Sequence, residues 1–280
     1  MPVSIRVAHS PDSDDAFMFY ALAAGKIDTG DRRYVHELQD IESLNRRALR
    51  GELEVTAVSF HAYAYLHDRY ALLPHGCSMG DGYGPRLVAR EPLTGDVAQA
   101  LAGKRIAIPG ERTTANLALK LLRSDVTTVL VPFDQIEDHV LDGQSDMGLL
   151  IHEGQLTYAD RGLHLWADLG QWFKQTTGLP LPLGGNVVRK DLGEAMVKQI
   201  SKDLRASIVY GLEHRAPALA HAQQYSRGLD PAKTDEFVGM YVNDFTVDYG
   251  VVGRAAVQRL LDDACAAGLI PGVRAEFVED

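Results

Sequence analysis

Short apolar runs and amphipathic stretches alternate through the first part of the chain. Three runs have the length of buried strands, and three stretches place apolar residues at helical spacing. In chain order, these segments are Val3–Ala8, Ala16–Ala24, Tyr34–Leu38, Ile41–Leu49, Val55–Val58 and Ser59–Leu66. Strands that alternate with helices in this way predict a parallel sheet covered by helices.

A second strand–helix pattern follows Arg86–Arg90, a strand that leads out of the first unit. Its predicted elements are a loop and strand over Leu101–Pro109, the helix Asn116–Leu122, the strand Val129–Val131, the helix Gln135–Leu141 and the strand Met147–Ile151. Leu179–Gly185 is rich in proline and glycine, which predicts a linker. Helices are expected over 191–213, 214–226, 230–241 and 251–268.

These patterns predict two α/β lobes. Residues 1–91 together with 187–280 would form a larger, discontinuous lobe, and residues 92–186 a smaller inserted one. The chain then crosses twice between the lobes, which is the layout of a hinged protein with an interdomain cleft. Domain interfaces are favoured ligand sites, so the cleft is where we expect the function to lie.

The composition disfavours several classes of partner. The 280 residues are 46% hydrophobic and 24% charged, which is ordinary for a globular protein, and the formal net charge is −10. Nucleic acids and anionic membrane surfaces attract basic proteins, so we expect neither as a partner. A small carboxylate substrate is still compatible, because a few donors in a cleft can hold it. The oligomeric state is not predicted by the sequence.

Metal, export and membrane signals are also missing from the sequence. Cys77 and Cys265 lie far apart, and neither the cysteines nor the histidines show the spacing of a metal site. We therefore expect no metal and no cofactor. The N-terminus lacks a basic region followed by an apolar stretch, and no run of about 18 apolar residues occurs. A cytoplasmic protein without a membrane span is the expectation.

His152 is the most informative candidate for chemistry. It directly follows the apolar run Met147–Ile151, and ligands bind at the carboxyl ends of strands in open α/β sheets. An imidazole with an ordinary pKa near 6.5 accepts a proton at neutral pH. A structural histidine and a catalytic base explain this position about equally well. Glu153 would point to the opposite face of a continuing strand, so we do not expect it to orient His152.

Two serines stand at the start of predicted helices. Ser10 opens an aspartate-rich loop whose first-turn N–H groups favour an anion or an oxygen-rich ligand. The aspartates would repel an anion, so Ser10 and the backbone are the expected contacts. Ser59 follows the next strand, and no Gly-x-Ser-x-Gly elbow surrounds it, which argues against a hydrolase triad. Taken alone, each serine is explained more simply by helix capping.

The turn at 110–115 is the third candidate. It follows a strand and opens a helix, so Thr113, Thr114 and the Ala115 N–H are presented at a strand's carboxyl end. No Gly-Lys-Ser/Thr follows, so this is not a phosphate-binding Walker loop. A carboxylate-binding role and a simple threonine cap remain equally open.

Six segments in a fixed order resemble the MqnD family, the 1,4-dihydroxy-6-naphthoate synthases of the futalosine route to menaquinone. They are Ala8–Leu22, Ser59–Ala64, Gly80–Pro85, Pro109–Ala115, Leu150–Glu153 and Thr177–Gly184. Each segment is weak evidence alone, but the ordered set covers essentially the whole chain. The resemblance implies a fold like that of type 2 periplasmic binding proteins, with two α/β lobes and an interdomain cleft.

The resemblance also implies an activity. The family's lyases convert cyclic dehypoxanthinyl futalosine to 1,4-dihydroxy-6-naphthoate and release a sugar-derived fragment, without a cofactor. His152 corresponds to the family's proposed base, and Ser59, Thr114 and Ala115 match residues that line its site. Two other functions stay open: chorismate dehydratase, whose typical opening Ser-Tyr-Leu-Asn motif is absent here, and a non-catalytic small-acid binding protein.

This chain departs from the family in its first loop. Many members have Ser-Pro-Cys-Pro-Asn-Asp-Thr where this chain has Ser-Pro-Asp-Ser-Asp-Asp-Ala. Ser10, Pro11 and Asp15 match that pattern, whereas Asp12, Ser13, Asp14 and Ala16 do not. The resemblance therefore does not extend to the contacts that these four positions make, and a subfamily with an altered substrate stays open as an alternative.

Overall fold

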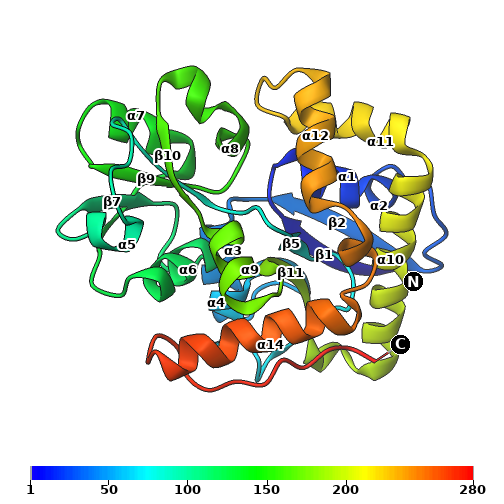
Figure 1. Ribbon diagram of the computed structural model, residues 1–280. Helices are drawn as coiled ribbons and strands as arrows, with labels where there is room; N and C mark the ends of the chain where they lie inside the picture. Colours follow the sequence, from blue (N-terminus) through cyan, green and yellow to red (C-terminus); the bar gives the residue numbers. More distant parts are fainter. Residues whose placement is uncertain (1, 280) are drawn as a thin grey trace.

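A computed structural model describes residues 2–279, and it contains two mixed β-sheets, each with its own helices (Figure 1). The prediction of two α/β lobes is confirmed. In Figure 1 the second sheet, with β7, β9 and β10, lies to the left, and the first sheet, with β1, β2 and β11, lies to the right. Both sheets contain parallel strands whose carboxyl ends carry loops that can form a ligand site.

The first sheet has the order β2-β1-β3-β11-β4, with β5 also pairing with β11. Its strands are β1 (Val3–His9), β2 (Arg32–Leu38), β3 (Val55–Ser59), β4 (Tyr70–Leu72), β5 (Ser78–Gly80) and β11 (Leu181–Arg189). The strand β1 is parallel to both β2 and β3, whereas β11 is antiparallel to β3, β4 and β5. The carboxyl ends of β1 and β3 therefore lie at the same edge.

The second sheet has the order β10-β6-β9-β7-β8. Its strands are β6 (Arg86–Ala89), β7 (Arg105–Ile108), β8 (Thr127–Leu130), β9 (Met147–Leu150) and β10 (His164–Asp168). The strand β7 is parallel to β8 and β9, and β6 is antiparallel to β9 and β10. The carboxyl ends of β7 and β9 again share one edge.

The helices begin with short segments near the first sheet. They are α1 (Ser13–Met18), α2 (Tyr20–Ala23), α3 (Ile41–Leu49) and α4 (Phe60–Tyr63). Those of the second part are α5 (Val97–Ala100), α6 (Thr114–Leu122), η1 (Phe133–Gln135), α7 (Ile136–Leu141), α8 (Gly154–Thr157), η2 (Tyr158–Arg161) and α9 (Leu169–Thr177). The C-terminal series is η3 (Lys190–Leu192), α10 (Glu194–Glu213), α11 (Arg215–Ala222), η4 (Gln223–Tyr225), α12 (Pro231–Tyr241), α13 (Asp244–Val247) and α14 (Gly250–Ala266). The C-terminal series covers the first sheet, with α14 packed against β11 (Figure 1).

One predicted segment is wrong. Leu179–Gly185, expected to be a linker, enters the nine-residue strand β11, which lies between β3 and β4. Its glycines serve close packing, since a Cβ on Gly185 would lie 2.2 Å from the Tyr249 hydroxyl. Proline and glycine here mark a tightly packed strand with a register shift near Pro182.

The other differences from prediction concern the ends of elements. The helix expected at Ala16–Ala24 begins earlier, at Ser13, and is interrupted at Phe19, although the Phe19 and Ala23 N–H groups keep their i−4 hydrogen bonds. The helix expected over 214–226 ends as α11 at Ala222 and continues as η4.

The division into residues 1–91 with 187–280 and 92–186 stays a proposal. The strand β6 pairs in the second sheet, which favours a first crossing between β5 and β6. One apolar cluster extends from Val58 and Val187 in the first sheet to Ile106 and Leu149 in the second. The two sheets thus share packed side chains beside the site.

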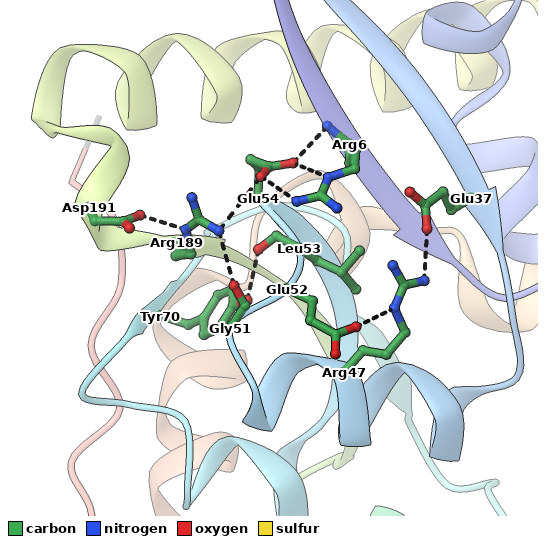
Figure 2. A network of polar contacts seen from close by, with 10 residues as sticks. All are labelled: Arg6, Glu37, Arg47, Gly51, Glu52, Leu53, Glu54, Tyr70, Arg189 and Asp191. Carbon is green, nitrogen blue, oxygen red and sulfur yellow. Dashed lines mark hydrogen bonds and ion pairs between the residues drawn. The ribbon is translucent and has the colours of Figure 1, made fainter.

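A polar network fastens the first sheet (Figure 2). Glu54, just before β3, accepts hydrogen bonds from the Arg6 backbone N–H at 3.1 Å and from the Arg6 guanidinium at 2.8 Å. Arg189, at the end of β11, lies 3.6 Å from Glu54 and donates to the Gly51 carbonyl at 3.0 Å. Because Ser59 ends β3, this network lies at the end of the strand opposite the candidate site.

No helix within residues 2–279 is long and apolar enough to cross a membrane.

Candidate functional site

Four strand ends meet at one cavity. The loops after β1 and β3 come from the first sheet, and those after β7 and β9 from the second. All the residues singled out from the sequence line this cavity: Ser10, Ser59, Thr113, Thr114, Ala115 and His152. Their roles remain predictions, but the structure brings them together from both sheets, as expected for a site at the carboxyl ends of parallel strands.

His152 is held by an aspartate from the other sheet. Its Nδ1 lies 2.8 Å from Asp12 Oδ2, and the two side chains are 14% and 4% exposed. The Phe133 ring packs against the imidazole in an edge-to-face arrangement, with ring centroids 4.3 Å apart. The His152 Nε2 is buried and has no hydrogen-bond partner among residues 2–279. A neutral imidazole with its proton on Nδ1 therefore presents Nε2 as a free base.

The charges around His152 favour its protonated form. Burial alone would lower the pKa of His152, but the charge and hydrogen bond of Asp12, together with the charge of Glu153, raise it above 6.5. Conversely, burial would raise the pKa of Asp12, and His152 and Arg227 lower it to about 2. Asp12 is thus a carboxylate at neutral pH that stabilises an imidazolium.

Glu153 does not face away from this pair, contrary to the sequence prediction. The strand β9 ends at Leu150, so strand alternation no longer determines the directions of the side chains at 152 and 153. Glu153 is 6% exposed, and its Oε2 lies 3.4 Å from Arg227 Nη1. Burial, followed by the charge of Asp12, raises the pKa of Glu153.

Arg227 was not singled out from the sequence and lies at the centre of these charges. Its Nη2 is 2.6 Å from Asp12 Oδ1. Asp12, His152 and Glu153 carry potential metal-ligand atoms within 4.8 Å of one another, the one such group among the described residues. Because the Arg227 guanidinium pairs with both carboxylates, these residues do not fit a metal ion unless Arg227 moves.

The acidic loop after β1 makes hydrogen bonds within itself that helix capping alone does not require. The Ser10 N–H donates to Asp15 Oδ2 at 2.7 Å, and the Ser10 side chain also interacts with Asp12. Asp14 faces the cavity, where burial and then the negative charges of Asp15 and Asp12 raise its pKa well above the usual range. Burial likewise raises the pKa of Asp15, to about 6. Burial and the mutual repulsion of these carboxylates therefore oppose ionisation of Asp14 and Asp15.

Ser59 is fixed by a buried asparagine. Asn45, from α3, accepts from the Ser59 N–H at 3.0 Å and approaches its hydroxyl through Nδ2 at 3.2 Å. The same Nδ2 lies 3.4 Å from the Arg112 carbonyl, in the loop after β7. Ser59 is the N-cap of α4 but makes no side-chain capping hydrogen bond. Its orientation thus comes from Asn45 and not from capping.

The three residues at the start of α6 differ in what they do. The Thr113 hydroxyl caps the helix, donating to the Gly110 carbonyl at 2.9 Å and accepting from Asn116 N–H at 3.2 Å. The Thr114 hydroxyl donates to the Leu183 carbonyl of β11. The N–H groups of Thr114 and Ala115 belong to the first helical turn, where no helical acceptor exists. They are the free donors of this turn.

Sequence reasoning missed Asp12, Arg227, Asn45 and Tyr241 as site residues. The departure of Asp12 from the family pattern was visible, but the acceptor it supplies to His152 depends on two sheets meeting. Arg227 lies in a turn between η4 and α12, and no local motif marks it. Tyr241 lines the cavity and donates to Gln155 Oε1 at 2.8 Å, thereby joining α12 to α8.

Comparison with known sequences gives the family. A profile of the family described as menaquinone biosynthesis matches residues 5–266. A Thermus thermophilus protein named 1,4-dihydroxy-6-naphtoate synthase is 41% identical over 276 residues, which cover 98% of this chain and 99% of that protein. A Streptomyces coelicolor protein of the same name is 38% identical over 96% of both chains.

Solved structures agree with the fold. The crystal structure of an Archaeoglobus fulgidus protein has a TM-score of 0.91 and 49% identity, covering 95% of this chain and 98% of that one. An alkanesulfonate-binding protein from Xanthomonas axonopodis pv. citri has a TM-score of 0.70 at 16% identity, covering 99% and 96%. A Candida albicans protein with the generic periplasmic binding protein fold has a TM-score of 0.67 at 13% identity, covering 99% and 98%.

At such low identity the last two likenesses concern the fold alone, and they confirm the expected two-lobed, periplasmic-binding-protein-like architecture. The family profile and the two full-length relatives also show the family. This chain therefore belongs to the menaquinone biosynthesis family that includes the 1,4-dihydroxy-6-naphthoate synthases.

Proposed function

We propose that this protein is a carbon–carbon lyase that converts cyclic dehypoxanthinyl futalosine to 1,4-dihydroxy-6-naphthoate. The full-length similarity to two proteins named as that synthase supports the reaction. The observation that carries the proposal is the buried Asp12–His152 pair, which lies in the same cavity as the turns of Ser59 and Thr114. The cytoplasmic location of the protein remains a prediction.

His152 acts as the base in this proposal. Its Nε2 removes a proton from the sugar-derived part of the substrate, which starts ring opening and fragmentation. Asp12 keeps the proton of the neutral imidazole on Nδ1 and stabilises the imidazolium that forms. Formation of an aromatic product supplies driving force for the fragmentation.

The opposite side of the cavity binds the substrate. The N–H groups of Thr114 and Ala115 would hold its carboxylate at the N-terminus of α6, where the helix dipole favours negative charge. Ser59, oriented by Asn45, and Ser10 would donate or accept at the oxygen atoms of the substrate. Thr113 shapes the turn through its capping bonds. Closure of the two lobes would exclude water.

The test is an assay of the purified protein with cyclic dehypoxanthinyl futalosine, followed by mass spectrometry of the products. We expect 1,4-dihydroxy-6-naphthoate from the wild type and none from His152→Asn. His164→Asn, a change at an exposed histidine of β10, is the matched control and should retain turnover. Chorismate is offered in parallel, because its dehydration would reveal the sister activity. Unchanged turnover in His152→Asn would remove the role proposed for His152.

A further inference from the structure

Arg227 has an unusual backbone for an arginine. Its φ is 50°, the one positive φ at a non-glycine residue within 2–279. L side chains rarely adopt this conformation, and such outliers persist where surrounding contacts enforce them. The residue that follows, Gly228, also has a positive φ, of 89°. This turn therefore directs the Arg227 side chain at the expense of local backbone preference.

The Arg227 guanidinium has three partners around the site. It lies 2.6 Å from Asp12 Oδ1 and 3.4 Å from Glu153 Oε2, and it covers the Phe133 ring at 4.3 Å. Asp12 follows β1 of the first sheet, whereas Phe133 and Glu153 follow β8 and β9 of the second. A single side chain thus binds groups from both sheets. The planar fork of arginine suits such a task, which a lysine ammonium performs less specifically.

The two oxygens of Asp12 have different partners, His152 and Arg227. Oδ2 pairs with His152 Nδ1 at 2.8 Å, and Oδ1 pairs with Arg227. Asp14, Asp15 and Glu153 are the other acidic groups nearby. Burial raises the pKa of each of them, whereas His152 and Arg227 lower the pKa of Asp12. With Oδ1 held by Arg227, Oδ2 stays directed at the imidazole.

We propose that Arg227 is a positioning residue that joins the two sheets across the cleft and locks Asp12 onto His152 Nδ1. This inference rests on the proposed role of His152 as the base. Arg227 itself does not transfer the proton. It fixes which nitrogen of His152 carries a proton and which is left free. The competing interpretation is that Arg227 only joins the two lobes through its ion pairs, or only adds a positive charge near His152, without orienting Asp12.

The first test observes His152 directly in the unliganded protein, by NMR of 15N-labelled histidine across a pH series. Loss of a nearby positive charge alone would raise the pKa of His152, since Arg227 lowers it. Loss of the ion pair between Arg227 and Asp12 lets the carboxylate turn away from His152, which lowers the pKa of His152. For Arg227→Met we therefore expect a lower pKa, and loss of the low-field Nδ1 proton signal of a histidine–carboxylate pair. A raised pKa with the proton signal retained would overturn the proposal.

The second test is kinetic. Arg227→Met should lower kcat by roughly 10²-fold, the cost of a misplaced catalytic group, with little change in KM. Arg227→Lys should restore only part of kcat, because it keeps the charge without the fork. In an Asp12→Asn background, Arg227→Met should cause no further loss, because the two residues act as one unit. Additive losses would overturn the proposal.

Arg215 supplies the matched control. It also pairs with an aspartate, Asp235, at 3.0 Å, and also covers a phenylalanine ring, Phe17, at 5.5 Å, but it lies outside the cavity. Arg215→Met should leave kcat and the His152 titration unchanged. If the wild type does not turn over the cyclic substrate, the proposed function fails, while the His152 titration still decides the role of Arg227. Circular dichroism verifies that each variant is folded.

Discussion

Asp12 and His152 follow strands of different sheets, yet their side chains meet at 2.8 Å in the cavity that both sheets enclose. The imidazole and its carboxylate therefore face each other only when the sheets have the relative position seen here. Any movement that opens the cleft separates the base from its partner. Alignment of the base and exclusion of water are thus coupled to the same motion.

Replacing Asp12 tests the pair directly. Asp12→Asn keeps the size of the side chain but removes its charge, and an amide nitrogen facing Nδ1 would favour the wrong tautomer. We expect kcat to fall by at least about 10²-fold, by analogy with the larger loss at a serine protease triad. Steady-state kinetics at pH 7 provide the measurement. A loss below about three-fold would mean that His152 works without its carboxylate.

The pH dependence of the reaction should follow His152. A base must be neutral, so kcat/KM should rise with pH through a midpoint above 6.5, because Asp12 and Glu153 raise the pKa of His152 against the effect of burial. Asp14, Asp15 and Arg227 also lie near the pair, and Glu137 and Asp134 line the adjoining cavity. In Asp12→Asn the midpoint should move to lower pH. If wild type and Asp12→Asn have the same pH profile, the rise in kcat/KM is due to the titration of another group.

Replacing Thr114 tests whether its hydroxyl positions the turn at the start of α6. Thr114→Val preserves shape but removes the hydrogen bond to the Leu183 carbonyl. If this hydrogen bond positions the backbone N–H groups that hold the substrate carboxylate, KM should rise about ten-fold, as expected when a hydrogen bond to a charged group is weakened, with kcat little changed. Thr128→Val, in β8 away from the cavity, is the control. An unchanged KM would show that the Thr114 hydroxyl does not position the turn.

The network in Figure 2 should contribute to stability and not to catalysis. Glu54→Gln replaces a carboxylate that binds Arg6 three times, and we expect a loss of about 2 kcal/mol in the free energy of unfolding. Glu194→Gln, in an exposed pair with Lys198, should cost less than about 0.5 kcal/mol. Urea unfolding measures both variants. A change in KM for Glu54→Gln would show that the two ends of the sheet communicate.

Buried His9 and its half-buried neighbour His36 should make the fold sensitive to acid. Burial, and for His9 also the charge of His36, lower the pKa of His9 to about 3 and that of His36 to about 4. The unfolded chain binds these protons near pH 6.5, so stability is lost as the pH falls below that value. His9 alone should account for about 2 kcal/mol between pH 7 and pH 5. Urea unfolding of wild type and His36→Gln at both pH values is the measurement, and an equal acid loss in both would contradict a role for His36.

The sequence predicts the strand ends well, because a short apolar run followed by a polar turn is a local signal. His152, Ser59 and Thr114 were found in this way. Asp12 and Arg227 were not, since their importance depends on which strand ends meet across two sheets. Glu153 does not follow the alternation of side chains along a strand because β9 ends at Leu150. The error at β11 has a similar origin: glycine permits both flexibility and close packing, and only the facing Tyr249 distinguishes them.

The position of β11 also constrains the order in which the chain can fold. All five strands of the second sheet precede residue 181 in the sequence, whereas the first sheet needs β11 to join β3 to β4. During synthesis, the later sheet in the chain is thus the first to have all of its strands. A nascent chain that stops before β11 holds one sheet with its full set of strands and one with a missing centre. The first sheet, whose strand β1 precedes Asp12, can therefore be completed only after β11 is synthesised, and we expect the Asp12–His152 pair to form no earlier than that.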